Sequence, residues 1–389
     1  MRFQVLDGWR GVCALLVALL HFPAFGHLFH LPLLRNAYLF VDFFFVLSGF
    51  VITHAYGRRL TDLAALTGYA IRRFGRLWPL HAVTLGVFVL IELCKLLAGQ
   101  GLGITFGTPP FTGITAAEAI PTNLALIHAL GVHDNNTWNG PSWSISTEFY
   151  VCLLFGLLVL TARRHLAILA AVIALSGWLA VAILSPRYMG ATYDYGFFRC
   201  LCGFFLGHLV HRVHLAVTEW PGFRQTAFRV LPLLEVAGVG LLIAGLSVPD
   251  LEAGGLASPP AFAAIVLIFS FEAGPLSRLL SSAPARWLGT RSYSIYMVHM
   301  IVVFVLWLGT SMAQKSLGRP LFGQTMAGKT EMIVLFHRDV WLADAVTALY
   351  VLCVLALAAI THRWIEEPGR RLFNDLANRR RPARLAEAG

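Results

Sequence analysis

Apolar stretches of about 17 to 25 residues recur along the whole chain, and each is long enough to cross a hydrocarbon core as an α-helix. Ten such stretches are expected, centred near residues 20, 47, 88, 152, 175, 205, 239, 267, 300 and 351. The composition agrees, because 57% of the residues are hydrophobic and only 13% are charged, whereas about a quarter of a soluble domain is charged. The sequence predicts an all-α fold, a polytopic integral membrane helical bundle of about ten transmembrane helices.

The basic residues are distributed unevenly between the loops that join these helices. With the N-terminus inside, the inner segments hold the pairs Arg58-Arg59 and Arg163-Arg164 and the arginines of the C-terminal region, whereas the outer segments hold few. This bias follows the positive-inside rule and predicts that both termini are cytoplasmic. It also accounts for the net charge of +10 without a nucleic-acid partner.

A transmembrane domain is expected over residues 1–369 and a basic cytoplasmic tail over 370–389. Residues 117–131 are too short and too polar to cross the membrane, and we expect them to lie at its surface. The first apolar stretch contains ionisable residues and lacks a small-residue cleavage site, so it is expected to remain as an anchor. The excess of arginine over lysine suggests a GC-rich bacterial genome, and the expected location is the bacterial inner membrane, with multiple passes.

Two ionisable residues, Arg10 and His21, lie in the first apolar stretch, LDGWRGVCALLVALLHF. Such residues are costly in a lipid-spanning helix and usually mark a function. Eleven residues are about three helical turns, so both side chains are expected on one helix face, with roughly 16 Å of rise between them. The spacing predicts a site that runs through half of the bilayer.

An acidic residue, Asp42, opens the second apolar stretch, VDFFFVLSGFVIT. One interpretation is an N-cap at the end of that helix. The other is that Asp42 accepts a hydrogen bond from His21 and so orients the imidazole, as an acid orients the base of a hydrolytic triad. Ser48 and Gly49 in the same stretch are interpreted as packing residues.

The segment YAIRRFGRLWPL is expected to form an amphipathic helix that lies on the cytoplasmic surface before the third span. Arg73 and Arg76 are three residues apart and therefore share a face of that helix. They are either a positive-inside anchor or a pair of guanidinium groups that binds the phosphates of a cytoplasmic ligand.

Polar and aromatic residues also gather in PSWSISTEFY, which leads into the fourth span and contains Ser142, Trp143 and Glu148. Glu148 lies within an apolar run, so it is expected to be functional or to pair with a buried arginine, for which Arg199 is the candidate. Aromatic rings beside carboxylates and amides also suit sugar hydroxyls.

In the ninth span, LGTRSYSIYMVHM places Tyr293, Tyr296 and His299 near one helix face. We expect Tyr296 and His299 to contribute to the same polar cavity as His21. After the tenth span, Glu366, Glu367 and Pro368 are expected to end the helix.

The six cysteines lie within or beside the apolar stretches and form no CxxC pair. Neither a disulfide framework nor a metal site is therefore expected. The chain also lacks a P-loop, a dinucleotide-binding glycine motif and an HExxH motif.

Seven blocks together make the chain resemble the acyltransferase 3 family of integral membrane acyltransferases. They are LDGWRG with His21 eleven residues after Arg10, VDFFFVLSGFVIT, RRFGRLWPL, PSWSISTEFY, RCLCGFFLG, LGTRSYSIYMVH and HRWIEEPGRR. The resemblance implies acyl-CoA, usually acetyl-CoA, as a co-substrate, with no permanently bound cofactor. It also implies an acceptor hydroxyl on a sugar or small molecule, catalysis by His21 and Arg10, and donor binding by Arg73 and Arg76.

The expected mechanism combines the two lines of reasoning. Acyl-CoA binds from the cytoplasm near Arg73, Arg76 and Arg10, and His21 either deprotonates the acceptor hydroxyl or carries the acyl group itself. The further site residues expected are Asp42 and Glu148 for catalysis, and Ser142, Trp143, Arg199, Tyr296 and His299 for substrate binding. The acceptor is a cell-envelope or exported carbohydrate, or alternatively a secondary metabolite such as a macrolide. A transporter or flippase is the competing class, because it also needs polar groups within the membrane.

Overall fold

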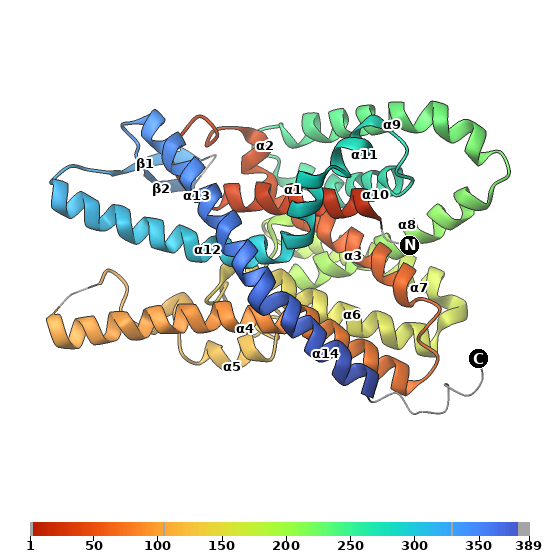
Figure 1. The fold of residues 1–389 in the computed structure, drawn as a ribbon, viewed down its shortest axis with the longest axis horizontal. Coiled ribbons are helices and arrows are strands. Elements are labelled where there is room, and N and C mark those ends of the chain that lie inside the picture. Colours follow the sequence, from red (N-terminus) through yellow and green to blue (C-terminus); the bar gives the residue numbers. More distant parts are fainter. Residues whose placement is uncertain (1–2, 104–105, 328–329, 380–389) are drawn as a thin grey trace. The chain divides into compact units, whose positions relative to one another are not determined.

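The computed structural model describes residues 3–103, 106–327 and 330–379, so the end of the expected basic tail, 380–389, lies outside the described residues. The chain divides into two compact units (Figure 1). The first unit comprises residues 1–47, 187–190 and 212–360, and the second comprises 48–186, 191–211 and 361–389.

The fold is all-α apart from one hairpin, as predicted. In chain order the α-helices are α1 (Gln4–Leu20), α2 (Pro32–Arg35), α3 (Phe40–Tyr56), α4 (Leu63–Leu102), α5 (Ala119–Leu124), α6 (Trp143–Thr161), α7 (Leu166–Leu184), α8 (Gly196–Glu219), α9 (Phe223–Leu246), α10 (Ser258–Phe269), α11 (Pro275–Leu280), α12 (Ala283–Leu317), α13 (Val340–Thr361) and α14 (Glu367–Arg379). The strands are β1 (Phe322–Ala327) and β2 (Thr330–Leu335).

Nine helical segments of the described chain are long and apolar enough to cross a membrane, and they include α3, α4, α6, α7, α8, α9, α10, α12 and α13. The first predicted span is not among them. It corresponds to α1, whose 17 residues rise by about 26 Å, a little less than a hydrocarbon core of about 30 Å. Only the short helix α5 forms within 117–131, so this segment does not cross, as predicted.

In the first unit, α1 packs along α12 at very close range. A Cβ atom at Gly11 would lie 2.6 Å from the backbone nitrogen of Gly289, and one at Gly8 would lie 2.2 Å from the carbonyl oxygen of Leu280. Only glycine permits these approaches. The two glycines of the LDGWRG block are therefore needed for packing, and they fix α1, which carries Arg10 and His21, against its neighbours.

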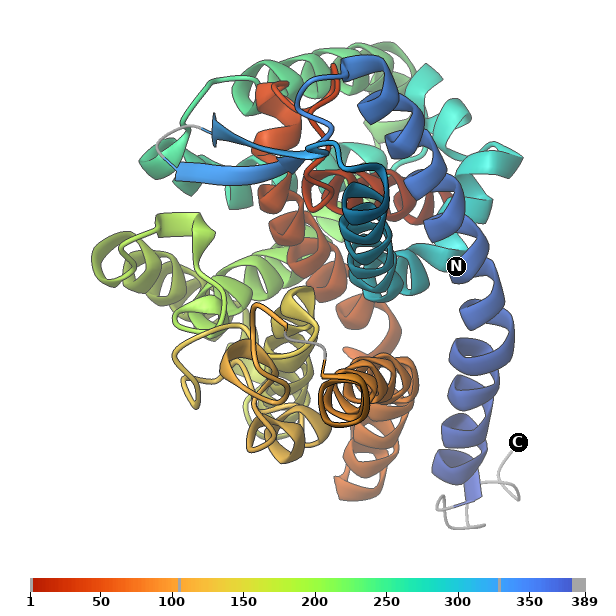
Figure 2. The same cartoon turned by 90° about the vertical axis from the view of Figure 1, so that its left-hand side faces the viewer.

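The hairpin β1–β2 was not predicted, and it holds the loop that follows α1 (Figures 1 and 2). The amide of Leu335 donates to the carbonyl of Pro23 at 2.8 Å, and the amide of Phe25 donates to the carbonyl of Leu335 at 2.9 Å. Behind the loop, Phe22 stacks on Tyr350 of α13, with ring centroids 4.3 Å apart. The chain after His21 is thus bound to both the hairpin and α13.

In the second unit, α4 is one helix of 40 residues, so the prediction of a separate surface-lying helix before the third span is wrong. Arg73 and Arg76 belong to the same helix as the span itself. The helix continues through Pro79, whose ring packs beside Gly369, where a Cβ atom would lie 2.7 Å from Pro79. A proline inside a helix removes one backbone hydrogen bond, and packing can compensate for that loss.

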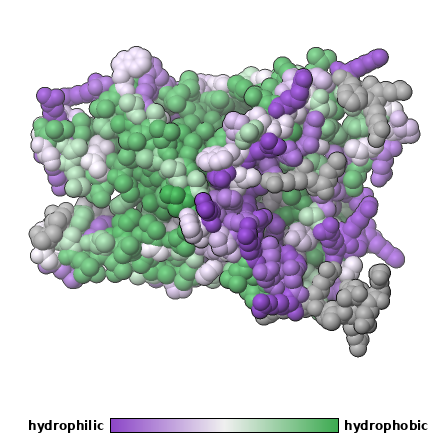
Figure 3. Space-filling model, viewed as in Figure 1, coloured by the Kyte–Doolittle hydropathy of each residue, from purple (hydrophilic) through white to green (hydrophobic). Residues whose placement is uncertain are grey.

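Helix α14 runs along α4 within the second unit (Figure 1). A π-helical turn, η7 (His362–Glu366), joins α13 to α14, and Pro368 is the second residue of α14. The prediction that Glu366, Glu367 and Pro368 end the helix is therefore wrong. Proline is tolerated in the first turn, where its missing N–H group has no helical partner to lose. Hydrophilic residues gather over α14 in Figure 3, as its charged sequence requires.

Candidate active site

His21 is the residue that closes the C-terminal end of α1, in the first unit. Its Nδ1–H group donates to the carbonyl oxygen of Val17 at 2.8 Å, one turn back along the helix. Because Nδ1 holds the proton in this arrangement, Nε2 of the neutral ring is an acceptor. The fold thus presents His21 in the tautomer that a general base requires.

His299 of α12 lies beside it, with the ring centroids of His21 and His299 5.0 Å apart. Tyr296 is next to His299, at 5.9 Å between ring centroids. The His299 side chain is fully buried, and neither of its ring nitrogens has a hydrogen-bond partner among the described residues. The structure therefore brings together three of the predicted site residues. Buried polar atoms without partners are costly, so they indicate where a water or a substrate hydroxyl binds.

Asp42 does not make the hydrogen bond to His21 that the sequence suggested. It is the third residue of α3 rather than an N-cap, and its carboxylate accepts a hydrogen bond from the buried hydroxyl of Ser258 at 2.8 Å. In the described chain, the hydrogen bond of His21 goes to Val17. The reason is local, since a carbonyl four residues back reaches Nδ1 without any tertiary contact. Whether Asp42 takes part in catalysis stays a prediction.

Arg10 lies one turn after Asp7 on α1, and its guanidinium is 3.5 Å from the Asp7 carboxylate. The pair is partly exposed, with 30% of the Arg10 side chain accessible. Arg10 lies on α1 and His21 is the C-cap of that helix. That the two side chains share one face, as the eleven-residue spacing indicates, stays a prediction.

The second unit contains the predicted donor-binding arginines, and they differ in their partners. Arg76 forms an ion pair with Glu366 of the π-helical turn, and Glu366 also contacts Nδ1 of His362 at 3.1 Å. Glu366 is 2% exposed, so this carboxylate is buried against α4. Sequence reasoning missed the pair because it treated Glu366 as a helix end. The signal was an acidic residue placed directly after an apolar stretch.

Arg73, one turn before Arg76, is arranged differently. Its guanidinium carbon lies 5.8 Å from the centroid of the Tyr56 ring, within cation–π range. Its buried Nε has no hydrogen-bond partner in the part of the chain that the structure describes. Arg73 therefore has an unused donor, whereas Arg76 is engaged.

The predicted ion pair between Glu148 and Arg199 does not form. Glu148 accepts a hydrogen bond from the hydroxyl of Ser48 at 2.5 Å, so Ser48 is more than the packing residue expected. Arg199 is 1% exposed, and its guanidinium carbon lies 5.4 Å from the centroid of the Trp143 ring. Its Nη1 donates to the carbonyl of Ala191 at 3.2 Å.

Ser142 leads to two histidines, His81 and His128, that were not among the site residues expected from the sequence. Its hydroxyl lies 3.1 Å from Nε2 of His128, and His128 stacks on His81 with ring centroids 5.4 Å apart. Burial lowers the pKa of His128 to about 3, so this ring is neutral at physiological pH. Both histidines have a buried Nδ1 without a partner among the described residues. A histidine in a polar loop beside the PSW motif was the available signal.

Comparison with known proteins shows where the chain belongs. A family model described as an acyltransferase domain matches residues 3–363, nearly the whole chain. The chain belongs to the acyltransferase 3 family. Its apolar helices and this membership make it a multi-pass membrane acyltransferase. No solved structure is significantly similar to it.

Several relatives of this acyltransferase carry more specific names. It is 26% identical over 342 residues to the putative peptidoglycan O-acetyltransferase YrhL of Bacillus subtilis (strain 168), covering 82% of this chain and 50% of the relative. It is 25% identical over 320 residues to the peptidoglycan O-acetyltransferase OatA of Listeria monocytogenes, covering 77% and 49%. The acyltransferase MdmB of Streptomyces mycarofaciens is 28% identical over 286 residues, covering 68% and 67%. The chain thus spans about half the length of the two peptidoglycan O-acetyltransferases.

Proposed function

We propose that this acyltransferase moves an acetyl group from acetyl-CoA to a hydroxyl of a cell-envelope or exported carbohydrate, with His21 as the general base. The observation that carries the proposal is the hydrogen bond from Nδ1 of His21 to Val17, which leaves Nε2 as a proton acceptor. The neighbouring ring of His299 and Tyr296 supply further polar groups for a hydroxyl. The names of the peptidoglycan O-acetyltransferases support a carbohydrate acceptor.

The chemical step balances around Nε2 of His21. The acceptor oxygen attacks the thioester carbonyl carbon while its proton passes to Nε2, the new C–O bond forms, and the C–S bond breaks. The proton then passes from the imidazolium to the sulfur of the leaving CoA. General-base catalysis of this kind contributes about 10²- to 10⁴-fold. An acyl group carried on Nε2 is the alternative route, and it predicts a covalent intermediate that can be trapped.

We assign the phosphates of the donor to Arg73 and Arg76. Arginine suits this role because its planar guanidinium can bind phosphate with two hydrogen bonds. Arg73 has an unused Nε, whereas Arg76 is already bound by Glu366. Arg73 is therefore expected to contribute more to donor affinity than Arg76. Arg10, on the helix of His21, is assigned to the donor as well.

A secondary-metabolite acceptor is the second candidate, and the similarity to the acyltransferase MdmB favours it. A transporter or flippase is the remaining class. A transporter differs from an acyltransferase in one measurable way, because transport does not require cleavage of the thioester of acetyl-CoA. Product release from acetyl-CoA by the purified protein, without any gradient, separates the two classes.

The test uses the full chain in lipid nanodiscs with radiolabelled acetyl-CoA and an N-acetylglucosamine–N-acetylmuramic acid disaccharide. His21→Asn keeps a donor for the Val17 carbonyl but removes the base, so it should lower the rate at least 10²-fold while the protein stays folded. His165→Ala, at an exposed histidine, is the control and should retain full activity. Wild-type rates in His21→Asn would remove His21 from the mechanism.

A further inference from the structure

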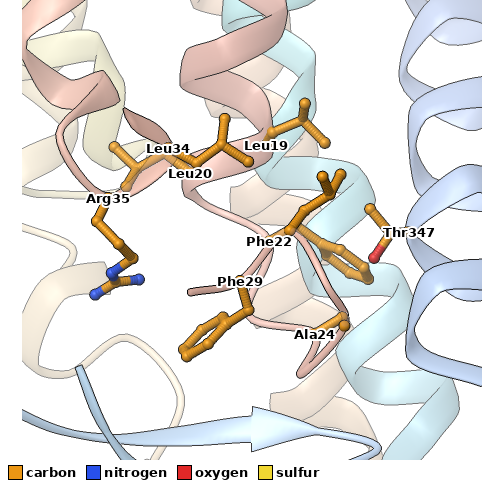
Figure 4. Close-up of a pocket in the computed structure, with 10 residues that line it drawn as sticks. Leu19, Leu20, Phe22, Ala24, Phe29, Leu34, Arg35 and Thr347 are labelled. Carbon is orange, nitrogen blue, oxygen red and sulfur yellow. The ribbon is translucent and has the colours of Figure 1, made fainter. Parts of the chain in front are cut away.

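A small pocket that is partly open to solvent lies in the first unit, at the C-terminal end of α1 (Figure 4). Leu19, Leu20 and Phe22, the sequence neighbours of His21, form part of its wall. Phe29, in the loop after α1, and Arg35, the last residue of α2, also line the pocket. Eight of the ten lining residues are apolar or glycine, and the other two are Arg35 and Thr347, so a charged side chain in this pocket requires an explanation.

Arg35 is that charged side chain. It is partly buried, and burial lowers the pKa of its guanidinium, although arginine remains charged at any physiological pH. Its partners in the described chain are the ring of Phe29, 5.1 Å from the guanidinium carbon, and the sulfur of Met332, 3.3 Å from Nη2. A thioether is a weak acceptor. No carboxylate among the described residues neutralises this cation, so the pocket holds positive charge that an anion can compensate.

Asp344, an acidic residue that contacts this loop, is already bound by His27. Asp344 of α13 accepts from the amide of His27 at 2.9 Å and contacts Nδ1 of His27 at 2.5 Å. A Cβ atom at Gly26 would lie 2.2 Å from the Asp344 carboxylate, so the glycine is needed for this contact. The contacts of this carboxylate are therefore with His27, and no ion pair joins it to Arg35 among the described residues.

The walls of the pocket are fixed on several sides. Leu335 of β2 is hydrogen-bonded to the loop on both sides of Ala24, through Pro23 and Phe25. Asn36, directly after Arg35, donates to the carbonyls of Leu246 at 3.0 Å and Val248 at 2.8 Å. These contacts hold Arg35 in place before any ligand arrives, and such preorganisation lowers the entropic cost of binding.

We propose that this pocket binds an anionic group, a carboxylate or a phosphate, of the acceptor carbohydrate through the guanidinium of Arg35. The inference rests on the proposed function in that it takes the ligand to be the acceptor. The aromatic rings of Phe22 and Phe29 give the sugar apolar surface, and the sequence neighbours of His21 form part of the same wall. An anionic acceptor is thus selected over a neutral one of the same shape.

The test compares acceptors that differ only in charge. One pair is the N-acetylglucosamine–N-acetylmuramic acid disaccharide and its methyl ester, and the other is N-acetylglucosamine 1-phosphate and the methyl glycoside. Binding to the full chain in nanodiscs is measured without donor, and acetyl transfer is measured with labelled acetyl-CoA. Wild type should bind at least one anionic member about 10- to 100-fold more tightly than its neutral partner, since hydrogen bonds to charged groups have this strength. The pair that shows the preference distinguishes carboxylate from phosphate.

Two variants make the result specific to Arg35. Arg35→Gln should abolish the preference for the anionic acceptor by weakening its binding and raising its KM, with kcat nearly unchanged. Arg35→Lys should restore part of the preference. Arg319→Gln removes an exposed arginine of the same unit and should keep the wild-type preference. Equal affinities for charged and neutral members, or a preference that survives in Arg35→Gln, overturn the inference. Charge-selective binding without any acetyl transfer supports the pocket and contradicts the proposed function.

Discussion

The polar groups around His21 and those around Arg76 are satisfied in opposite ways. Beside His21, both ring nitrogens of His299 are buried without a hydrogen-bond partner among the described residues. Arg76, by contrast, is paired with Glu366, which also contacts His362. Unsatisfied buried groups cost stability and mark places that a ligand completes, whereas a satisfied ion pair holds a structure together. The comparison assigns chemistry to the His21 cluster and positioning to the Arg76 pair.

The same contrast separates two arginines that the sequence treats alike. Arg73 and Arg76 are one turn apart on α4, yet only Arg73 keeps a buried Nε without a partner in the described chain. Spacing alone therefore does not decide which arginine is available to a phosphate.

The largest expected effect is a loss of stability when Arg76 is replaced, and it tests whether Arg76 and Arg73 have different roles. Arg76→Gln removes the arginine that pairs with the buried carboxylate of Glu366, and removal of one partner of a buried ion pair costs about 3 kcal/mol or more. Arg73→Gln should cost less than about 1 kcal/mol but should raise KM for acetyl-CoA more than Arg76→Gln does. Thermal unfolding in nanodiscs and initial rates at varied donor concentration measure the two effects.

A double variant gives the control for this prediction. Arg76→Gln with Glu366→Gln removes both charges, so it should recover most of the stability lost in Arg76→Gln alone. If the double variant is as unstable as the single one, Glu366 is not the reason for the loss. If Arg76→Gln unfolds at the wild-type temperature, the structural role of the pair is refuted.

Most of the membrane-spanning helices could be predicted from the sequence, because the length of an apolar run is a local signal. Nine of the ten expected spans, the short non-crossing segment before α6, and the proximity of His21, Tyr296 and His299 are confirmed. The continuity of α4 through Pro79 could not be predicted, because a later helix, α14, packs over that region.

The partners of the site residues were harder to predict than the residues themselves. Asp42 pairs with Ser258, 216 positions away, and Glu148 pairs with Ser48, 100 positions away. Serines are common in these helices, and nothing in their local pattern shows which carboxylate packing will bring near. The hairpin β1–β2 was missed for a similar reason, since its short strands gain stability from the loop after α1.

A smaller effect is expected at His299, and it sharpens the same comparison. His299→Phe replaces a buried imidazole without hydrogen-bond partners by an apolar ring, so the unfolding temperature should stay the same or rise. Acetyl transfer should fall about tenfold or more, because the ring beside His21 no longer offers polar atoms to the substrate. Unfolding temperature and kcat/KM are measured on the same preparation. A variant that is less stable but equally active would place His299 among the packing residues.

The smallest effect concerns His128, the buried histidine bound to Ser142 in the second unit. Its pKa is about 3 in the folded chain, against an ordinary value of 6.5, because burial disfavours the charged ring. The unfolded chain therefore binds more protons here between these pH values. The free energy of unfolding is highest above pH 6.5, where this ring is neutral in both states. It declines as the pH falls, by about 0.8 kcal/mol at about pH 6.

The loss of stability that His128 causes at lower pH can be isolated by comparing unfolding temperatures at about pH 7.5 and 6 for wild type and His128→Gln. The variant has no imidazole to protonate, so its stability should depend less on pH by roughly that amount, even if it is less stable at both values. His165→Gln, at an exposed histidine of the same unit, should follow the wild type. An equal pH dependence in wild type and His128→Gln would mean that protonation of the His128 ring does not destabilise the fold. Water would then reach the ring beside Ser142, unlike the buried ion pair of Arg76 and Glu366.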